Sequence, residues 1–384
     1  MFAEPCRNDR GTRLTVYDVD YLRDGRWLEF LERHPCASVF HAPEWLEALR
    51  RTYGYQPVIL TTSPPGRDLG NALVFCRVQS WLTGRRMVSL PFSDHCEPLV
   101  RSQEDLGSLL SGPKRDVTAC KWNYLEIRSA NLGQAAPADL EEAETFCLHR
   151  LDLHPSLEEL FRGFHKNGVQ KMIRRAEREA LAYEEGRSES LLAKFYGLTV
   201  LTRRWQQLPP PPLAWYRNLI ACMGDKLKIR LASKGGHPVA SILTLRYKDA
   251  LVYKYGCSNR SFFKLGGTQL LLWKAIQEAK NEGLVEFDMG RSAWDNPGLI
   301  VFKDRWGATR SLLSYLRYPP RPSQPGRTGL GMRIAKPIIS ETMGPSSVKS
   351  RPNCPASRSS ATASLGFPAS RRARAFRIAR LTTC

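Results

Sequence analysis

The sequence predicts an α/β protein with mixed sheets, built from two domains of similar construction that precede a disordered tail. The chain has 384 residues, of which 42% are hydrophobic, and can therefore form two or three cores at roughly 100–200 residues per domain. The order helix, helix, strands occurs in residues 20–150 and again in residues 151–318. From residue 319 onward, Pro, Ser, Arg, Gly and Ala dominate without hydrophobic periodicity, which predicts disorder.

The first predicted domain, residues 20–150, follows a flexible N-terminus of residues 1–19. Two helices come first, at residues 21–33 and 43–51; in the second, Trp45 and Leu49 recur at helical spacing behind Pro43. Runs of β-forming residues separated by Pro and Gly follow and predict an antiparallel meander. The predicted strands of the meander are 57–62, 71–79 and 86–90, and one further strand is predicted separately at 122–127.

A basic segment, FHKNGVQKMIRRAER, opens the second predicted domain, residues 151–318. In a helix over residues 162–178, Lys171, Arg174, Arg175 and Arg178 lie on one flank, because residues three and four apart share a helix face. This positive ridge suits a polyanionic partner.

The rest of the second domain repeats the first. The predicted helices are 188–204 and 213–223, and the strands joined by tight turns are 227–233, 238–247 and 250–255. A long helix then begins at Gly266-Gly267-Thr268 and ends at residue 281, and a buried strand follows at 285–289. A strand, a glycine turn, a helix and a second strand form a ligand cleft in many α/β folds.

Composition argues against several other classes of protein. No run approaches the roughly 18 apolar residues of a membrane span, and the first 14 residues lack a secretory signal, so we expect a cytoplasmic protein. The ten cysteines are scattered without a CxxC pair, which indicates reduced thiols and no metal site. The net charge is +20, but residues 319–384 alone carry twelve Lys or Arg against the single acid Glu341.

Two segments suggest ligand contacts on the predicted cleft. Gly266, Gly267 and Thr268 open a helix, where free backbone N–H groups can bind a phosphate or carboxylate; an ordinary helix start is the alternative. In the strand VYKYG, alternation places Tyr253 and Tyr255 on one face, where both phenols can orient a polar substrate. The alternative is the half-buried face of an ordinary strand.

Two further segments place charged residues near the same cleft. The run FDMGRS ends a strand, so that Asp288 or Arg291 faces the ligand. Lys303 stands between Phe302 and Trp306, which favours an oriented ammonium over a solvated surface lysine.

Taken together, FHKNGVQKMIRRAER, VYKYGCSN, GGTQLLLWKAIQEAKNEG, FDMGRS and GLIVFKDRWGA resemble the FemAB-type family, which overlaps the BioF2-like (CelD-like) acetyltransferases. The resemblance covers residues 20–318 and is strongest from residue 160. It implies two GNAT-like acyl-N-acyltransferase domains in tandem and transfer of an acyl group to an amine on an envelope or sugar precursor. It also implies an acyl-CoA or aminoacyl-tRNA co-substrate and no permanently bound cofactor.

The resemblance also implies roles for individual residues. Lys303, beside Phe302, corresponds to a catalytic lysine next to the reacting groups, where a fixed cation stabilises developing negative charge. Tyr253 and Tyr255 correspond to positions that line the cleft. The remaining implied substrate contacts are Arg291 and Arg204 as anion contacts, Asp288, and Asp94 in the first-domain loop LPFSDHCEPL.

The sequence departs from the relatives at the donor site. Typical GNAT enzymes carry [RQ]xxGx[GA], whereas residues 263–268 keep only the glycines, which leaves the use of CoA open. Two other functions stay open as well: a nucleic-acid-binding protein that uses the basic helix and tail, and an inactive scaffold of the same fold. The basic tail suits RNA or a membrane surface.

Overall fold

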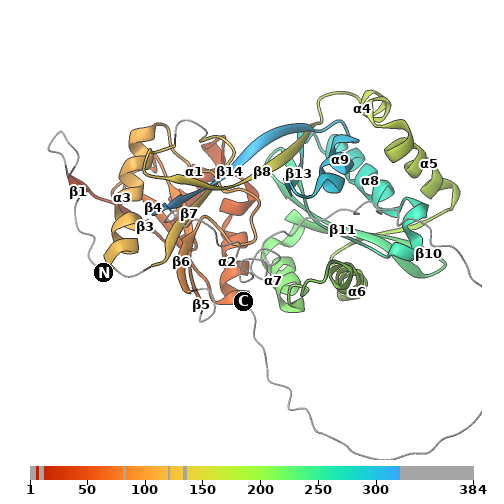
Figure 1. The fold of residues 1–384 in the computed structure, drawn as a ribbon, viewed down its shortest axis with the longest axis horizontal. Helices are drawn as coiled ribbons and strands as arrows, with labels where there is room; N and C mark the ends of the chain where they lie inside the picture. Colours follow the sequence, from red (N-terminus) through yellow and green to blue (C-terminus); the bar gives the residue numbers. More distant parts are fainter. Residues whose placement is uncertain (1–5, 8–12, 81–83, 120–121, 133–135, 321–384) are drawn as a thin grey trace, which may run out of the picture. The chain divides into compact units, whose positions relative to one another are not determined.

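The computed structural model describes residues 6–7, 13–80, 84–119, 122–132 and 136–320, all within one unit of the chain, Met1–Ser346 (Figure 1). The fold is α/β, as predicted, with helices on both faces of a large mixed sheet. Apart from residues 319 and 320, the predicted disordered tail lies outside the described residues.

Twelve of the described strands form one sheet in the order β3-β4-β5-β6-β7-β14-β8-β13-β12-β11-β10-β9. The first half contributes β3 (Tyr17–Val19), β4 (Gln56–Thr61), β5 (Leu73–Ser80), β6 (Gly84–Val88) and β7 (Tyr124–Ser129). The second half contributes β9 (Ala182–Gly186), β10 (Leu227–Lys234), β11 (His237–Tyr247), β12 (Ala250–Ser258) and β13 (Glu286–Ala293). Strands β1 (Cys6–Arg7) and β2 (Arg13–Leu14) pair separately.

The two halves are joined by an exchange of strands. β8 (Glu141–Asp152) follows β7 in the chain but pairs with β13, whereas β14 (Thr309–Tyr318) follows β13 but pairs with β7. β8 and β14 also pair with each other, so each half completes its sheet with a strand from the other (Figure 1). The predicted division at residue 150 falls inside β8, and the domain ranges 20–150 and 151–318 stay a prediction.

The predicted antiparallel meander is confirmed, because β4, β5 and β6 pair antiparallel in that order. The separately predicted strand at 122–127, β7, pairs in parallel with β6. Parallel neighbours need a crossover connection. Here it includes α3 (Gln103–Ala119), a helix that the sequence analysis missed because Gly107, Gly112 and Pro113 lie inside it. The second half has the same arrangement, with α8 (Gly267–Asn281) between the parallel strands β12 and β13.

One face of the sheet is covered by two helix pairs, α1 (Gly25–Arg33) with α2 (Pro43–Tyr53) and α6 (Glu189–Gln206) with α7 (Leu213–Met223). A short 3₁₀ turn (Val39–His41) precedes α2, and α2 packs against α7. Trp45 and Trp215 meet edge to face with ring centroids 5.4 Å apart, so one core spans both halves. α1 begins later than predicted because Asp24 caps it through the N–H of Arg26.

The opposite face of the second half carries α4 (Leu157–Gly163), a π-helical turn (Lys166–Gln170), α5 (Lys171–Arg178), α8 and α9 (Pro297–Asp304). Short 3₁₀ turns (Gly224–Lys226 and Arg260–Leu265) precede β10 and α8. The single basic helix predicted over 162–178 is interrupted, because Phe164 has an extended backbone at the end of α4. None of the helices in the described ranges is long and apolar enough to cross a membrane.

Candidate functional site

A fork between β12 and β13 organises the second half. The two strands pair in parallel at only three positions, from Ala250 opposite Glu286 to Val252 opposite Asp288, and then separate. β12 also carries a bulge, because Leu243 pairs with Tyr255 and Thr244 with Tyr253, which leaves Lys254 without a partner residue on β11. Bulges of this kind re-aim side chains next to functional sites.

The bulge overturns the predicted arrangement of the two tyrosines. One extra residue shifts the alternation of a strand, so Tyr253 packs in the core under α8 while Tyr255 packs in the core under α6 and α7. Both side chains are buried, on opposite faces of the sheet. Tyr255 lines a pocket beside the end of β12.

The fork is closed by a loop from the first half. Asp94 Oδ2 lies 3.4 Å from Lys254 Nζ on β12, and Asp94 Oδ1 lies 3.7 Å from Arg291 Nε on β13. All three side chains are at most 5% exposed. Tyr315 on β14 donates a hydrogen bond of 2.9 Å to the backbone oxygen of Asp94. Asp94, which was predicted to contact the substrate, is therefore a buried ion-pair partner of Lys254 and Arg291 in this structure.

Lys303 on α9 is fully buried. Its ammonium donates hydrogen bonds to the backbone oxygens of Gly290 (2.8 Å) and Arg291 (2.9 Å), at the outer edge of the fork. Burial lowers the pKa of Lys303 to about 7, against the opposing attraction of Asp94 and Asp288. The lysine thus fixes the backbone of β13, while its neighbour Phe302 packs in the core beneath α8.

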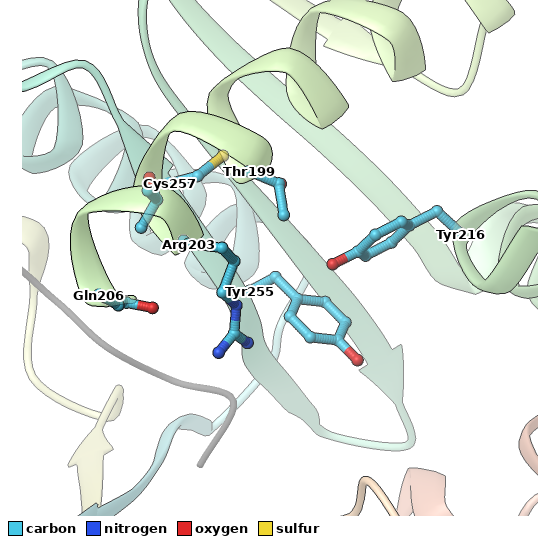
Figure 2. A pocket seen from close by; sticks show the side chains of 8 residues that line it. Thr199, Arg203, Gln206, Tyr216, Tyr255 and Cys257 are labelled. Carbon is cyan, nitrogen blue, oxygen red and sulfur yellow. The ribbon is translucent and has the colours of Figure 1, made fainter. Parts of the chain in front are cut away.

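A small pocket that is open to solvent lies beside the end of β12. We call it the Arg203 pocket, and it is lined by Thr199, Thr202, Arg203, Gln206, Tyr216, Tyr255, Gly256 and Cys257 (Figure 2). The guanidinium of Arg203 lies between Gln206 and Tyr255 in this view. Trp215 holds the Tyr255 hydroxyl in place with a hydrogen bond of 2.7 Å from its indole N–H.

Arg203 is 7% exposed, and its side chain forms no hydrogen bond or ion pair with any residue that the structure describes. A buried cation is costly unless an anion compensates it. Gln206 Oε1 in the same wall is also buried and has no partner in the described part of the chain. The Arg203 pocket therefore has the chemistry of a site for an anionic group.

Arg203 was not among the residues predicted from the sequence; its neighbour Arg204, which was predicted, is exposed. Consecutive helix positions point about 100° apart, so only one of the two can face the sheet. The signal was present in the spacing: Phe195, Thr199 and Arg203 follow one another at four-residue intervals along the buried face of α6.

The predicted glycine cradle has a packing explanation. Gly266 has φ +78°, a backbone conformation that favours glycine, and a Cβ there would lie 2.2 Å from the backbone oxygen of Met172. A Cβ on Gly267 would lie 2.8 Å from Val239 Cγ1. Both glycines and Thr268 are buried, so these residues let α8 approach α5 and β11 closely, and their role in donor binding stays a prediction.

Comparisons with known proteins agree with this architecture. A family model described as an acetyltransferase (GNAT) domain matches residues 164–298, which contain α6, the Arg203 pocket and the β12–β13 fork. A crystal structure of FemX is similar over 78% of this chain and 96% of its own, with a TM-score of 0.60 and 13% identity. The fold is that of the GNAT acyltransferases.

Two more structures share the fold. The C-terminal domain (DUF2156) of a protein assigned as a lysylphosphatidylglycerol synthetase from Agrobacterium fabrum matches 82% of this chain and 96% of its own, with a TM-score of 0.51 and 15% identity. A tandem GNAT protein from the clavulanic acid biosynthesis pathway matches 80% of this chain and 99% of its own, with a TM-score of 0.52 and 11% identity. The predicted pair of GNAT-like domains is thereby confirmed. The search of curated proteins gives no match in sequence.

Proposed function

We propose that this protein is an N-acyltransferase that moves an acetyl or aminoacyl group from an activated donor to an amine, in cell-envelope or exopolysaccharide biosynthesis. One observation carries the proposal: the forked strands and the Arg203 pocket, whose arginine is 7% exposed and has no anionic partner among the described residues, lie within the residues that match the GNAT acetyltransferase domain. The Arg203 pocket receives an anionic group of a substrate, and that anion supplies the partner that the guanidinium lacks.

The transfer is direct. Burial raises the pKa of Cys257, the one thiol in the Arg203 pocket, to about 12, so this thiol stays protonated at neutral pH and cannot serve as a nucleophile. The acceptor amine itself attacks the donor carbonyl, and negative charge develops on the carbonyl oxygen. Lys303 acts as a positioning residue, because its ammonium binds the backbone of Gly290 and Arg291 at the edge of the fork.

Acyl-CoA is the donor that we favour, since the matching domain is an acetyltransferase domain and the tandem GNAT neighbour is described with reference to AcCoA. Aminoacyl-tRNA is the alternative donor. The described structure contributes one observation in its favour: Lys171, Arg174 and Arg178 on α5 are exposed and form no ion pair with other described residues. An amine-bearing envelope or sugar precursor is the acceptor in either case.

The test uses the purified full-length protein with acetyl-CoA and a panel of amino sugars and lysine derivatives, and measures amine-dependent release of free CoA thiol. We expect Arg203→Ala to lower kcat/KM at least tenfold, because the buried cation is lost. Arg204→Ala, one residue along the same helix, should behave like the wild type. A parallel assay supplies tRNA carrying a labelled amino acid and measures label transferred to the same amines.

Three results decide between the alternatives. Release of free CoA thiol would identify acyl-CoA as the donor. Transfer of the labelled amino acid without thiol release would identify aminoacyl-tRNA as the donor. If neither donor is consumed, or if Arg203→Ala matches Arg204→Ala, the proposal is wrong.

A further inference from the structure

A second pocket lies between the two halves, where first-half loops meet β12 and β13, and we call it the His95 pocket. It encloses about 990 Å³ out to its open mouth. Its walls come from both halves of the chain, including the loop after α1, the loop after β6 and the turn between β11 and β12. None of the sequence-predicted site residues except Asp288 lines it.

The position of the His95 pocket follows from the first-half fork. β6 and β7 pair in parallel at three positions, ending with Val88 opposite Glu126. The loops that follow these two strands contribute His95, Glu97 and Asn131 to the pocket wall. The carboxyl ends of parallel strands are where open α/β sheets bind ligands.

The loop that carries His95 is held in an uncommon backbone conformation. Leu90 and Phe92 both have positive φ, 65° and 62°, which non-glycine residues rarely adopt. Arg128 on β7 fixes the loop by donating hydrogen bonds to the backbone oxygens of Leu90 (2.8 Å) and Ser93 (2.9 Å). The fold thus constrains the position of the next two side chains, one of which is His95.

His95 pairs with Asp288 across the two halves. Its Nε2 lies 3.0 Å from Asp288 Oδ2, and Asp288 Oδ1 accepts a hydrogen bond of 2.6 Å from the N–H of Gly290. The Asp288 contact orients the imidazole, as a carboxylate does for a histidine base. The other ring nitrogen, Nδ1, is buried and has no hydrogen-bond partner in the described part of the chain, although His95 lines the pocket.

The pocket wall is rich in carboxylates. Glu97 is satisfied by the Ser129 hydroxyl and by the N–H of Ala130 (2.6 Å), whereas Glu286 has Arg150 at 3.5 Å as its ion-pair partner. Burial, with the nearby charges of Asp288 and Asp249, raises the pKa of Glu286, because the negative charge there is incompletely compensated. A wall of this kind suits a cationic ligand.

We propose that the His95 pocket receives the primary ammonium group of the acyl acceptor, and that His95, held by Asp288, takes its proton. This inference rests on the proposed acyl transfer and adds to it the acceptor site and the base. The ammonium R–NH₃⁺ gives one proton to the Nδ1 lone pair of neutral His95. The resulting R–NH₂ attacks the acyl carbonyl, the bond from that carbon to the leaving group breaks, and the leaving group takes the second proton from nitrogen.

The pH dependence follows from the charges around His95. Burial alone lowers the pKa of His95, but the hydrogen bond and charge of Asp288, together with the charge of Glu97, outweigh it and raise the pKa above 6.5. Arg150 acts in the opposite direction, and Lys248 and Cys36 line the pocket farther along. A base must be neutral to accept a proton, so kcat/KM should rise with pH through the pKa of His95.

The experiment titrates full-length protein containing ¹⁵N-labelled histidine with n-butylamine as the probe and follows the imidazole signals by NMR. We expect saturable shifts at His95 and at least tenfold weaker binding in His95→Gln. His149→Gln is the matched control, because His149 is also buried and also contacts a carboxylate, Asp304 at 3.2 Å, but does not line the pocket. Control binding should equal that of the wild type.

The second readout is the pH profile of acetyl transfer. In His95→Gln, the rise of kcat/KM with pH should disappear. In Asp288→Asn, this rise should move to lower pH, because the carboxylate that raises the pKa of His95 is gone. The inference fails if n-butylamine leaves the His95 signals unchanged, or if kcat/KM of His95→Gln still rises with pH. Either result counts against it even when acetyl transfer is observed. If n-butylamine binds at His95 but no donor is consumed, the amine pocket stands and the proposed acyl transfer is wrong.

Discussion

The carboxylate of Asp94 lies 3.4 Å from the ammonium of Lys254, although the two residues are 160 positions apart in the chain. The rings of Phe40, Trp45 and Tyr255 surround the ammonium, with centroids 5.4–5.8 Å from Nζ. The bulge on β12 turns Lys254 to this side of the sheet, and the first-half loop supplies the compensating charge. The fork of one half is thus closed by the other half.

Replacing Asp94 with Asn should destabilise the protein strongly. The amide keeps the shape of the side chain but leaves Lys254 and Arg291 buried without their shared anion. Breaking a buried ion pair by removing one partner costs about 3–5 kcal/mol. Urea unfolding measures this loss directly. The control is Asp225→Asn, which breaks an exposed pair with Arg187 and should cost less than about 1 kcal/mol. Equal losses in the two variants would contradict a structural role for Asp94.

Gly267→Ala tests the packing explanation for the glycines at the start of α8. The added Cβ would lie 2.8 Å from Val239 Cγ1 and 3.1 Å from Ala240 Cβ, so we expect a loss of about 1–3 kcal/mol in the free energy of unfolding. Gly107→Ala in α3 is the control, because nothing lies within 4 Å of its Cβ position. That variant should gain about 0.5–1 kcal/mol from helix propensity. A neutral Gly267→Ala would remove the packing argument.

Local patterns predicted most of the second half well. The helices at 188–204 and 213–223 agree with α6 and α7 to within two residues, because apolar periodicity is strong there. The turn at Gly235-Gly236 marks the hairpin of β10 and β11, since both glycines have positive φ. The positions of α3 and the bulge at Lys254 were missed, the first because helix breakers lie inside the helix and the second because alternation assumes an uninterrupted strand.

The contacts that build the candidate sites depend on tertiary structure. The exchange between the halves decides the pairing partners of β8 and β14. No local signal in either strand encodes its partner. The same holds for His95 and Asp288, which are 193 residues apart and meet only because the first-half loop reaches β13. Arg203 is the exception, because the four-residue spacing on α6 was readable from sequence.

Reversing the charges of Lys171, Arg174 and Arg178 to Glu tests whether α5 binds tRNA. These side chains are exposed, so the change should leave unfolding unaffected while it weakens tRNA binding at least tenfold. Each phosphate contact that is lost lowers the slope of log K against log salt by about 0.7–0.9. Fluorescence anisotropy at several salt concentrations measures both quantities.

The control for α5 reverses Lys194, Lys226 and Lys228, which already pair with acidic residues. Because their charge is compensated, this variant should bind tRNA as the wild type does. Equal weakening in both triple variants would show that net charge, and not α5, determines the binding.

Lys303 makes the stability of the protein depend on pH in a defined direction. Its pKa of about 7 in the folded protein lies below the ordinary value of 10.5, so between these values the unfolded chain binds more protons than the folded one. Stability therefore rises with pH across this window, by at most about 1.4 kcal/mol per pH unit from this residue. Below pH 7 both states are protonated and the contribution is constant. Lys303→Met should remove this slope in urea unfolding between pH 7 and 9, whereas Lys274→Met, at an exposed position on α8, should keep it. Identical slopes in wild type and Lys303→Met would mean that the ammonium is not desolvated in the folded protein.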